Sequence, residues 1–264
     1  MNYSKNIIFE RYEKIDEDMR LERTKGSMLE AHYTKKHLSP YITKSCDILE
    51  LGCATGYYGM YFADKCARYL GIDFYAPHIE RFCEKVKDSG IENVSAKVGD
   101  ATDLREIPDD SFDVVLCLGP MYHLPKTRWS ECFSECRRVC KNGGIAAFAY
   151  INKVGLYAGA CESDPNYYPN EKTNEYVLKF GTDDEAPGVF YFTMPEEIEQ
   201  SALKYGFVKE KNLATDFFFD LGGISSADDK KMKLYMPLLD SMTAYESCTG
   251  MANHALLICK NNKG

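Results

Sequence analysis

Between residues 45 and 150 the chain alternates short apolar runs with amphipathic stretches. Short apolar runs are typical of buried strands, and apolar positions at helical spacing indicate the helices between them. Strands are expected at residues 47–51, 69–73, 94–98, 112–118 and 145–150, and helices at 57–65, 76–89 and 128–140, with a turn at 141–144. This alternation predicts an α/β fold with a doubly wound, mostly parallel sheet.

Residues 1–44 are predicted to form a helical N-terminal arm, because apolar residues recur there at helical spacing and Pro40 ends the second helix before the first strand. Several polar side chains of this arm could reach a ligand: Arg11, Tyr12, Arg20, Arg23 and His32. The plainer interpretation of each is a solvated helical cover.

The regular pattern stops after Ile151. Residues 152–192 read as irregular, aromatic and acidic. A helix begins at Met194-Pro195, strands are expected at 207–219 and 254–259, and residues 220–250 form a second, partly helical insertion. The insertions at 152–192 and 220–250 would lie over the carboxyl edge of the sheet, where such folds bind ligands. We expect them to form a lid on a substrate pocket; the alternative is a solvent-exposed elaboration.

Composition narrows the classes of function. The chain has 264 residues, enough for a single elaborated α/β domain, with 45% hydrophobic and 27% charged residues. A net charge of −8 weakens a nucleic-acid role, because phosphate binding needs a basic face. No stretch is apolar enough for a membrane span, and no signal-peptide pattern is present, so a cytoplasmic location is expected. The choice between monomer and homodimer stays open.

Eleven cysteines are spread singly along the chain and form no CxxC pair, which is typical of free thiols in a reducing compartment. Cys132, Cys136 and Cys140 would form one stripe on a helix. We interpret this stripe as core packing rather than as a metal site, and we expect no metal.

The stretch 47–59, DILELGCATGYYG, is a strand that runs into a glycine-bearing loop. Gly52 and Gly56 would let the backbone approach a ligand closely. A dinucleotide loop reads G-x-G-x-x-G, whereas Ala54 replaces the second glycine here and no Lys or Arg is present. Glu50 would repel a pyrophosphate but suits a ligand that carries an ammonium group.

Two further acids end the second and third strands. Asp73 lies where a carboxylate can accept both hydroxyls of a ribose. Asp100 can accept from an exocyclic amine, while Ala101 packs on an apolar ring. An amine, a ribose and an amino-purine together describe S-adenosylmethionine.

These residues lie in motifs that resemble the class I S-adenosylmethionine-dependent methyltransferases. ELGCATG resembles their first motif, GID their ribose-binding motif, GDATDL their adenine-binding motif, FDVVLCLGPMYHL the motif after strand four and RRVCKNGGIAAFAYI the turn into strand five. A bacterial subgroup with GPLYHL after strand four is especially similar, and its last strand also begins at an Asn-His pair, here Asn253-His254. The resemblance implies a seven-stranded sheet with the last strand antiparallel. It also implies cofactor contacts from Glu50, Gly52, Cys53, Ala54, Gly56, Asp73, Phe74, Asp100, Ala101 and Leu118.

Methyl transfer is in-line attack on a sulfonium, so catalysis is mainly positioning and water exclusion. Tyr122 and His123, just beyond the fourth strand, are the candidates for removing a proton from the acceptor. A structural role for His123 is an equal alternative. For His254, a buried and satisfied histidine is the better interpretation.

The acceptor is expected to be a small molecule, with an amine as the hypothesis, because rings and carboxylates of the insertion can bind a cation. Two alternatives stay open. One is a protein that binds S-adenosylmethionine without catalysis. The other is a nicotinamide-dependent oxidoreductase on a similar sheet, against which Glu50 and Ala54 argue.

Overall fold

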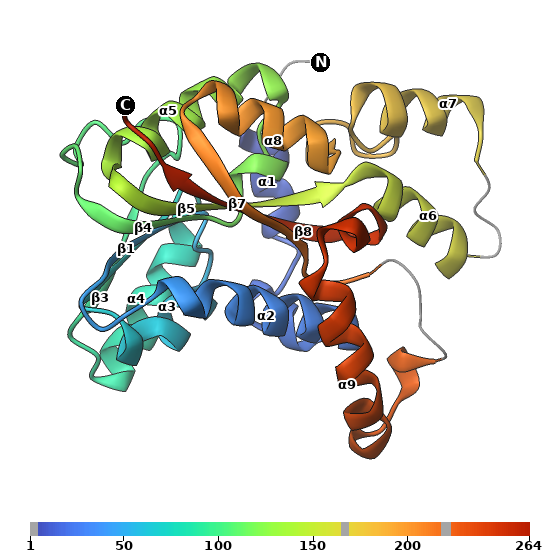
Figure 1. Ribbon diagram of the computed structural model, residues 1–264, viewed down its shortest axis with the longest axis horizontal. Helices are drawn as coiled ribbons and strands as arrows, with labels where there is room; N and C mark the ends of the chain where they lie inside the picture. The colour runs from blue at the N-terminus through green and yellow to red at the C-terminus, as the bar shows by residue number, and fades with distance from the viewer. Residues whose placement is uncertain (1–4, 165–168, 218–222) are drawn as a thin grey trace.

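The computed structural model describes residues 5–164, 169–217 and 223–264. One sheet forms the centre of the molecule, with strand order β3-β2-β1-β4-β5-β8-β7 and a short β6 that pairs with β5 (Figure 1). All neighbouring pairs are parallel except those made by β8, which is antiparallel to both β5 and β7. The predicted doubly wound sheet with an antiparallel last strand is therefore confirmed.

The strands are β1 (Asp47–Leu51), β2 (Arg68–Asp73), β3 (Val94–Val98), β4 (Phe112–Cys117), β5 (Cys140–Asn152), β6 (Phe192–Thr193), β7 (Phe207–Ala214) and β8 (His254–Asn261). The helices are α1 (Lys5–Tyr12), α2 (Lys25–Leu38), α3 (Tyr57–Phe62), α4 (Ala76–Ser89), α5 (Trp129–Val139), α6 (Lys153–Ser163), α7 (Glu171–Thr173), α8 (Pro195–Lys204) and α9 (Asp229–Ala244). A short 3₁₀ helix, Glu17–Glu22, joins α1 to α2.

Helices cover both faces of the sheet, and each face has its own apolar core. On one face, α5 and α8 contribute Phe133, Cys136 and Ile198 to a cluster with Phe148 and Phe207. On the other, residues of α2, α3 and α4 pack against the opposite sides of the same strands. Figure 1 shows the two layers, with α5 and α8 above the sheet and α2, α3 and α4 below it. Burial on both faces explains the continuously apolar run of β4.

The predicted start of the fifth strand was wrong, and the strand expected at 207–219 ends already at Ala214. The segment 141–144 was expected to be a turn after α5, but β5 already begins at Cys140. The register between β4 and β5 shifts between Phe112 and Val114, which accommodates the extra residues as a bulge. Gly143 adopts a φ of 78° there, so the glycine at this position belongs to a bulged strand end rather than to a separate turn.

The first insertion is more regular than its sequence indicates. It begins with α6, for which Asn152 provides the N-cap by accepting from the backbone N–H groups of Val154 and Gly155. A π-helical turn at Asn174–Phe180 follows. Tyr167 and Tyr168, part of the expected aromatic stretch, lie outside the described residues, as do Phe218 and Phe219 at the end of the expected 207–219 strand. In the second insertion, α9 packs against α2, where the Tyr33 hydroxyl donates to Asp240 at 2.9 Å.

No helix in the described ranges combines the length and the apolar character that a bilayer crossing requires.

Candidate active site

A cavity lies at the carboxyl ends of β1, β2, β3 and β4, which is the edge where open α/β sheets bind ligands. Residues from all four strand ends line it, and the N-terminal arm closes one side. The structure brings these predicted site residues together around the cavity: Glu50, Gly52, Cys53, Ala54, Asp73, Phe74, Asp100, Ala101, Leu118, Tyr122 and His123. Gly56 is not among the lining residues.

The first loop depends on unusual backbone conformations. Gly52 has a φ of 73°, and a Cβ at this position would meet the Gly119 Cα at 2.9 Å. Gly56 begins α3 with a φ of 85°, and its Cβ would strike the Phe82 ring at 2.1 Å. Its role is therefore to let the loop turn above α4. Ala54 also has a positive φ, 44°, a region that favours glycine, so this departure from the motif carries backbone strain.

Glu50 is buried at the end of β1 and accepts a hydrogen bond from the Tyr69 hydroxyl at 2.6 Å. Burial raises the pKa of Glu50 from 4.5 to about 8, despite this hydrogen bond, and the nearby Asp73 adds to the rise. A cationic group placed beside Glu50 would stabilise its charged form. The carboxyl is thus suited to a ligand ammonium.

Asp73 ties the first two strand ends together. One of its oxygens accepts from the backbone N–H of Ala54 and the other from that of Tyr75, each at 2.9 Å. Each carboxylate oxygen keeps a second lone pair, so ribose hydroxyls can still donate to it.

The Asp100 carboxylate is positioned by two contacts, one with the turn that follows it and one with the N-terminal arm. It accepts from the backbone and hydroxyl of Thr102, and it forms an ion pair with Lys5 of α1. These donors lower the pKa of Asp100 below its ordinary value, although burial opposes the shift. An adenine amine would have to share Asp100 with Lys5 or displace it.

His123 is enclosed by hydrogen bonds on both ring nitrogens. Its Nδ1 lies 2.8 Å from the carbonyl oxygen of Val189, and its Nε2 lies 2.8 Å from the hydroxyl of Tyr12. Since a carbonyl only accepts, Nδ1 carries the proton and Nε2 accepts from Tyr12. Burial lowers the pKa of His123 to about 4, so the ring is neutral at pH 7.

The Tyr122 hydroxyl has no hydrogen-bond partner within the described part of the chain, and burial raises the pKa of Tyr122 well above its ordinary value.

The sequence understated the contribution of the arm. Lys5, Tyr12, Glu17, Arg20 and Leu21 all line the cavity. The sequence already indicates Tyr12 and Arg20 as arm residues that could reach a ligand, because an aromatic ring and a guanidinium group are common in binding sites. Of the other candidates, Arg11 lies over the Phe190 ring at 4.8 Å, and Arg23 donates to the backbone of Asp16.

The insertions approach the site only indirectly. No described residue of 152–192 or 220–250 lines the cavity. Phe190 packs on the His123 ring with centroids 5.0 Å apart, and the backbone N–H of Tyr191 donates to the Tyr122 carbonyl. The described part of the first insertion therefore supports Tyr122 and His123 from behind, while the arm forms the wall that the insertions were expected to provide.

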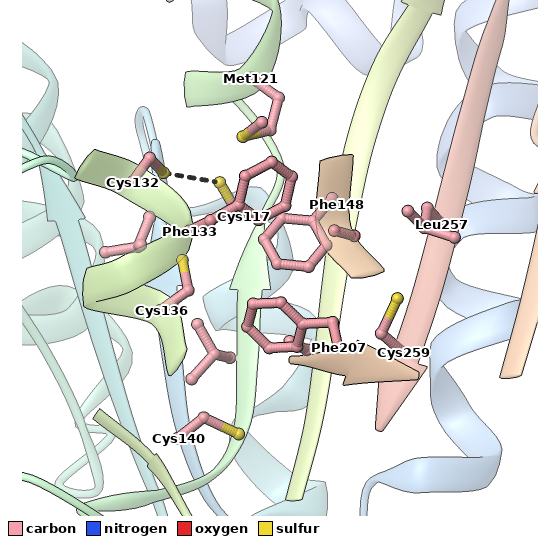
Figure 2. Packing of buried hydrophobic residues seen from close by; sticks show 14 of the residues in the cluster. Cys117, Met121, Cys132, Phe133, Cys136, Cys140, Phe148, Phe207, Leu257 and Cys259 are labelled. Atoms are coloured by element: carbon pink, nitrogen blue, oxygen red, sulfur yellow. Dashed lines mark hydrogen bonds between the residues drawn. The ribbon is translucent and has the colours of Figure 1, made fainter. Parts of the chain in front are cut away.

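The cysteine stripe has a different composition from the one expected. Cys117 of β4, rather than Cys140, lies with Cys132 and Cys136, and the three sulfur atoms are within 4.8 Å of one another (Figure 2). All three side chains are fully buried among Phe133, Phe148 and other apolar residues. The group offers three sulfur ligands, whereas a structural zinc site takes four, and no further ligand from the described residues completes the set. We retain the packing interpretation.

The comparisons with known proteins agree with this geometry. Residues 48–144 match the family described as "Methyltransferase domain". An uncharacterized methyltransferase of Bacillus subtilis, YcgJ, is 29% identical over 37% of this chain and 37% of its own length. A phosphatidylethanolamine N-methyltransferase of Cereibacter sphaeroides is 34% identical over 37% of this chain and 46% of its own length. The chain spans less than half the length of these two curated relatives.

Solved structures match over nearly the whole chain. The PH0226 protein of Pyrococcus horikoshii aligns with a TM-score of 0.64 and 18% identity over 95% of this chain and 98% of its own. A SAM-dependent methyltransferase of Methanosarcina mazei aligns with a TM-score of 0.58 and 14% identity over 86% of this chain and 97% of its own. At these identities, the likeness shows the fold.

Residues 48–144, which run from β1 into β5, thus resemble a methyltransferase domain, and the fold is the one found in solved S-adenosylmethionine-dependent methyltransferases. These matches support S-adenosylmethionine as the cofactor.

Proposed function

We propose that this chain transfers the methyl group of S-adenosylmethionine to a small-molecule acceptor. The observation that carries the proposal is that Glu50, Asp73 and Asp100, from the ends of three adjacent strands, line one cavity. This is the order that contacts with the ammonium, ribose and adenine amine of the cofactor would require. Gly52 and Ala54 bring the loop backbone against the same space. The three carboxylates and the loop backbone fit this cofactor, which supplies a methyl group on a positively charged sulfur.

The protein's own part is binding, orientation and exclusion of water. The arm places Tyr12, Arg20 and Leu21 over the cavity, which leaves room for a small acceptor rather than a polymer. Tyr122 stands at the end of β4 with its hydroxyl free among the described residues to contact an acceptor. The Nε2 of His123 accepts a hydrogen bond from the Tyr12 hydroxyl. A proton could therefore pass from the methyl acceptor to the Tyr12 oxygen while the Tyr12 proton moves to His123.

An amine acceptor remains a hypothesis. Aromatic and acidic residues of the first insertion motivated it, yet the described ones do not line the cavity. Of the acids that line the cavity among the described residues, only Glu17 is not assigned to the cofactor, and it pairs with Arg20, so the turnover screen below is needed to test the amine hypothesis.

Calorimetric titration and a turnover screen test the proposal. We expect S-adenosylmethionine and S-adenosylhomocysteine to bind at one site per chain, and NAD not to bind. We also expect S-adenosylhomocysteine to be released in the presence of at least one member of a panel of amines, phenols and thiols. Asp100→Ala should weaken cofactor binding about tenfold, as loss of a charge-assisted hydrogen bond implies. The exposed Glu84→Ala is the matched control.

Binding without turnover of any acceptor would favour a non-catalytic cofactor-binding protein. Binding of NAD in place of S-adenosylmethionine would overturn the proposal. Turnover of phenols and thiols but of no amine would end the amine hypothesis alone.

A further inference from the structure

A narrow recess continues from the cofactor cavity toward the ends of β5 and β8. The two spaces share Arg20, Tyr58, Leu118 and Tyr122 as a common wall. Beyond this wall, the recess is bounded by Glu30 of α2 and His254 of β8. Tyr122, a candidate to contact the acceptor, therefore stands at the junction of the two spaces.

Ion pairs hold in place the charged residues that line the recess, which are Arg20, Glu30 and His254. Arg20 donates to both oxygens of Glu30, at 3.0 and 3.1 Å, and its Nε donates to Glu17. His254 donates from Nδ1 to Asp216 at 2.7 Å, and the His254 backbone N–H donates to the other Asp216 oxygen. Each oxygen of Glu30 and Asp216 thus accepts one hydrogen bond from Arg20 or His254.

Among the charged residues that line the recess, His254 offers an N–H donor that no described residue uses. With Nδ1 turned to Asp216, the Nε2 of His254 is on the opposite side of the ring, and no described residue hydrogen-bonds to it. His254 still exposes 26% of its side-chain surface, although it borders an internal recess. Glu30 and Asp216 raise the pKa of His254 to about 9, against the effects of burial and of Arg20, so that at pH 7 Nε2 carries a proton. Arg20 uses three of its five N–H groups in the pairs described.

We infer that the recess holds a hydrogen-bond-accepting oxygen of the methyl acceptor, with the His254 Nε2–H as its principal donor. The acceptor would then extend from His254 past Tyr122 to the reactive end of the cofactor cavity. This inference rests on the proposed function and adds the substrate class: a small molecule with a carboxylate or carbonyl oxygen at the end remote from the atom that is methylated. His254 is thus a specificity-determining residue rather than only a packed one.

Small probes can test this inference without knowledge of the acceptor. The protein, labelled with ¹⁵N-histidine and saturated with S-adenosylhomocysteine, would be titrated with acetate, acetamide and ethylammonium at pH 7. The chain has five histidines, and His254→Gln assigns the relevant resonance. Acetate or acetamide should shift the His254 Nε2 signal in a saturable way, and ethylammonium should not. Comparison of acetate with acetamide distinguishes a charged from a neutral oxygen ligand. His37, outside the recess, is the internal control.

Two variants make the result specific. Saturation transfer from protein to the acetate or acetamide methyl protons should fall at least tenfold in His254→Phe, which has no donor. It should largely persist in His254→Gln, which retains an N–H near the same position. Both variants should bind S-adenosylhomocysteine as wild type does in calorimetry, because His254 does not line the cofactor cavity.

The absence of any saturable His254 response, or a response to ethylammonium alone, would overturn this inference. If S-adenosylhomocysteine binds and the His254 signal does not respond, only the acceptor subsite is wrong. If S-adenosylhomocysteine itself does not bind, the proposed function fails, and titration of the protein without it still tests the recess.

Discussion

Asp73, a proposed cofactor contact, also fixes the shape of the first loop. The residue is 7% exposed, and its carboxylate accepts hydrogen bonds from the backbone N–H groups of Ala54 and Tyr75. Since Ala54 has a strained positive φ, the bond from Asp73 helps to keep the loop in that conformation. Loss of this side chain should therefore affect the ligand both directly and through the loop.

We predict that Asp73→Ala weakens S-adenosylmethionine binding by more than about 1.4 kcal/mol, a factor of ten, because charge-assisted hydrogen bonds are lost. Isothermal titration calorimetry would measure the change. Asp64→Ala is a suitable control, because its side chain is 79% exposed. Unchanged affinity in Asp73→Ala would refute the ribose assignment.

Glu50 gives the site a dependence on pH. Its folded-state pKa of about 8 lies above the ordinary value of 4.5, so the folded protein binds one more proton than the unfolded chain between these values. The free energy of unfolding should therefore fall as the pH rises from about 5 to 8. A bound ammonium group reverses the effect by favouring the carboxylate.

Thermal unfolding at pH 5 to 8 tests this prediction. The melting temperature of wild type should fall more steeply with pH than that of Glu50→Gln, which keeps an acceptor for Tyr69 and cannot ionise. S-adenosylmethionine should stabilise wild type more at pH 8 than at pH 6. Parallel pH profiles of the two proteins would show that Glu50 does not titrate in this range.

At the scale of elements, the N-terminal arm is the part of the fold that completes the site. Phe9 of α1 stacks on Phe74 with ring centroids 5.2 Å apart, Lys5 pairs with Asp100, and Tyr12 bonds His123. These contacts join α1 to residues that follow β2, β3 and β4. Because the arm forms part of the cavity wall, its position and the binding of ligand are coupled.

Lys5 competes with the predicted adenine amine for Asp100. We expect Lys5→Met to tighten binding of S-adenosylhomocysteine two- to fivefold, since partly exposed ion pairs contribute about 0.5–1 kcal/mol. Lys14→Met, an exposed change just after α1, should leave the affinity unaltered. Weaker binding in Lys5→Met, measured by calorimetry, would instead mean that Lys5 contacts the ligand.

At the scale of the whole molecule, the sheet separates two apolar cores, and each contains both cysteine and aromatic side chains. The core beneath α5 contains Cys117, Cys132 and Cys136, while the opposite core is built around Tyr69, Phe62 and Phe82. The eleven cysteines are all free thiols. We expect the cysteine cluster to contribute through burial rather than through metal binding.

If the cluster only packs, a chelator should not change stability. We predict that EDTA leaves the melting temperature unaltered and that Cys132→Ala lowers the free energy of unfolding by about 1 kcal/mol, the value of one small buried apolar group. Denaturant unfolding would measure both. A chelator-sensitive transition in wild type that disappears in Cys132→Ala would identify a metal centre instead.

The sequence by itself determined the order of the elements from β1 to β5 and placed the glycine-bearing loop at the end of β1. Periodicity placed β1, β2, β3 and β4 nearly to the residue, because local apolar patterning reflects burial on a sheet. Glu50, Asp73 and Asp100 were found because parallel strands end at one edge, so residues that follow successive strands meet in space.

Only the tertiary structure decided which distant segments share the site. The partnership of Tyr12 with His123 spans 111 positions, and that of His254 with Asp216 spans 38, and neither leaves a periodic signal in the chain. It also showed Cys117, rather than Cys140, beside Cys132 and Cys136. Such contacts arise from how helices and loops pack on the sheet, and packing depends on the combined shape of many side chains rather than on any local pattern.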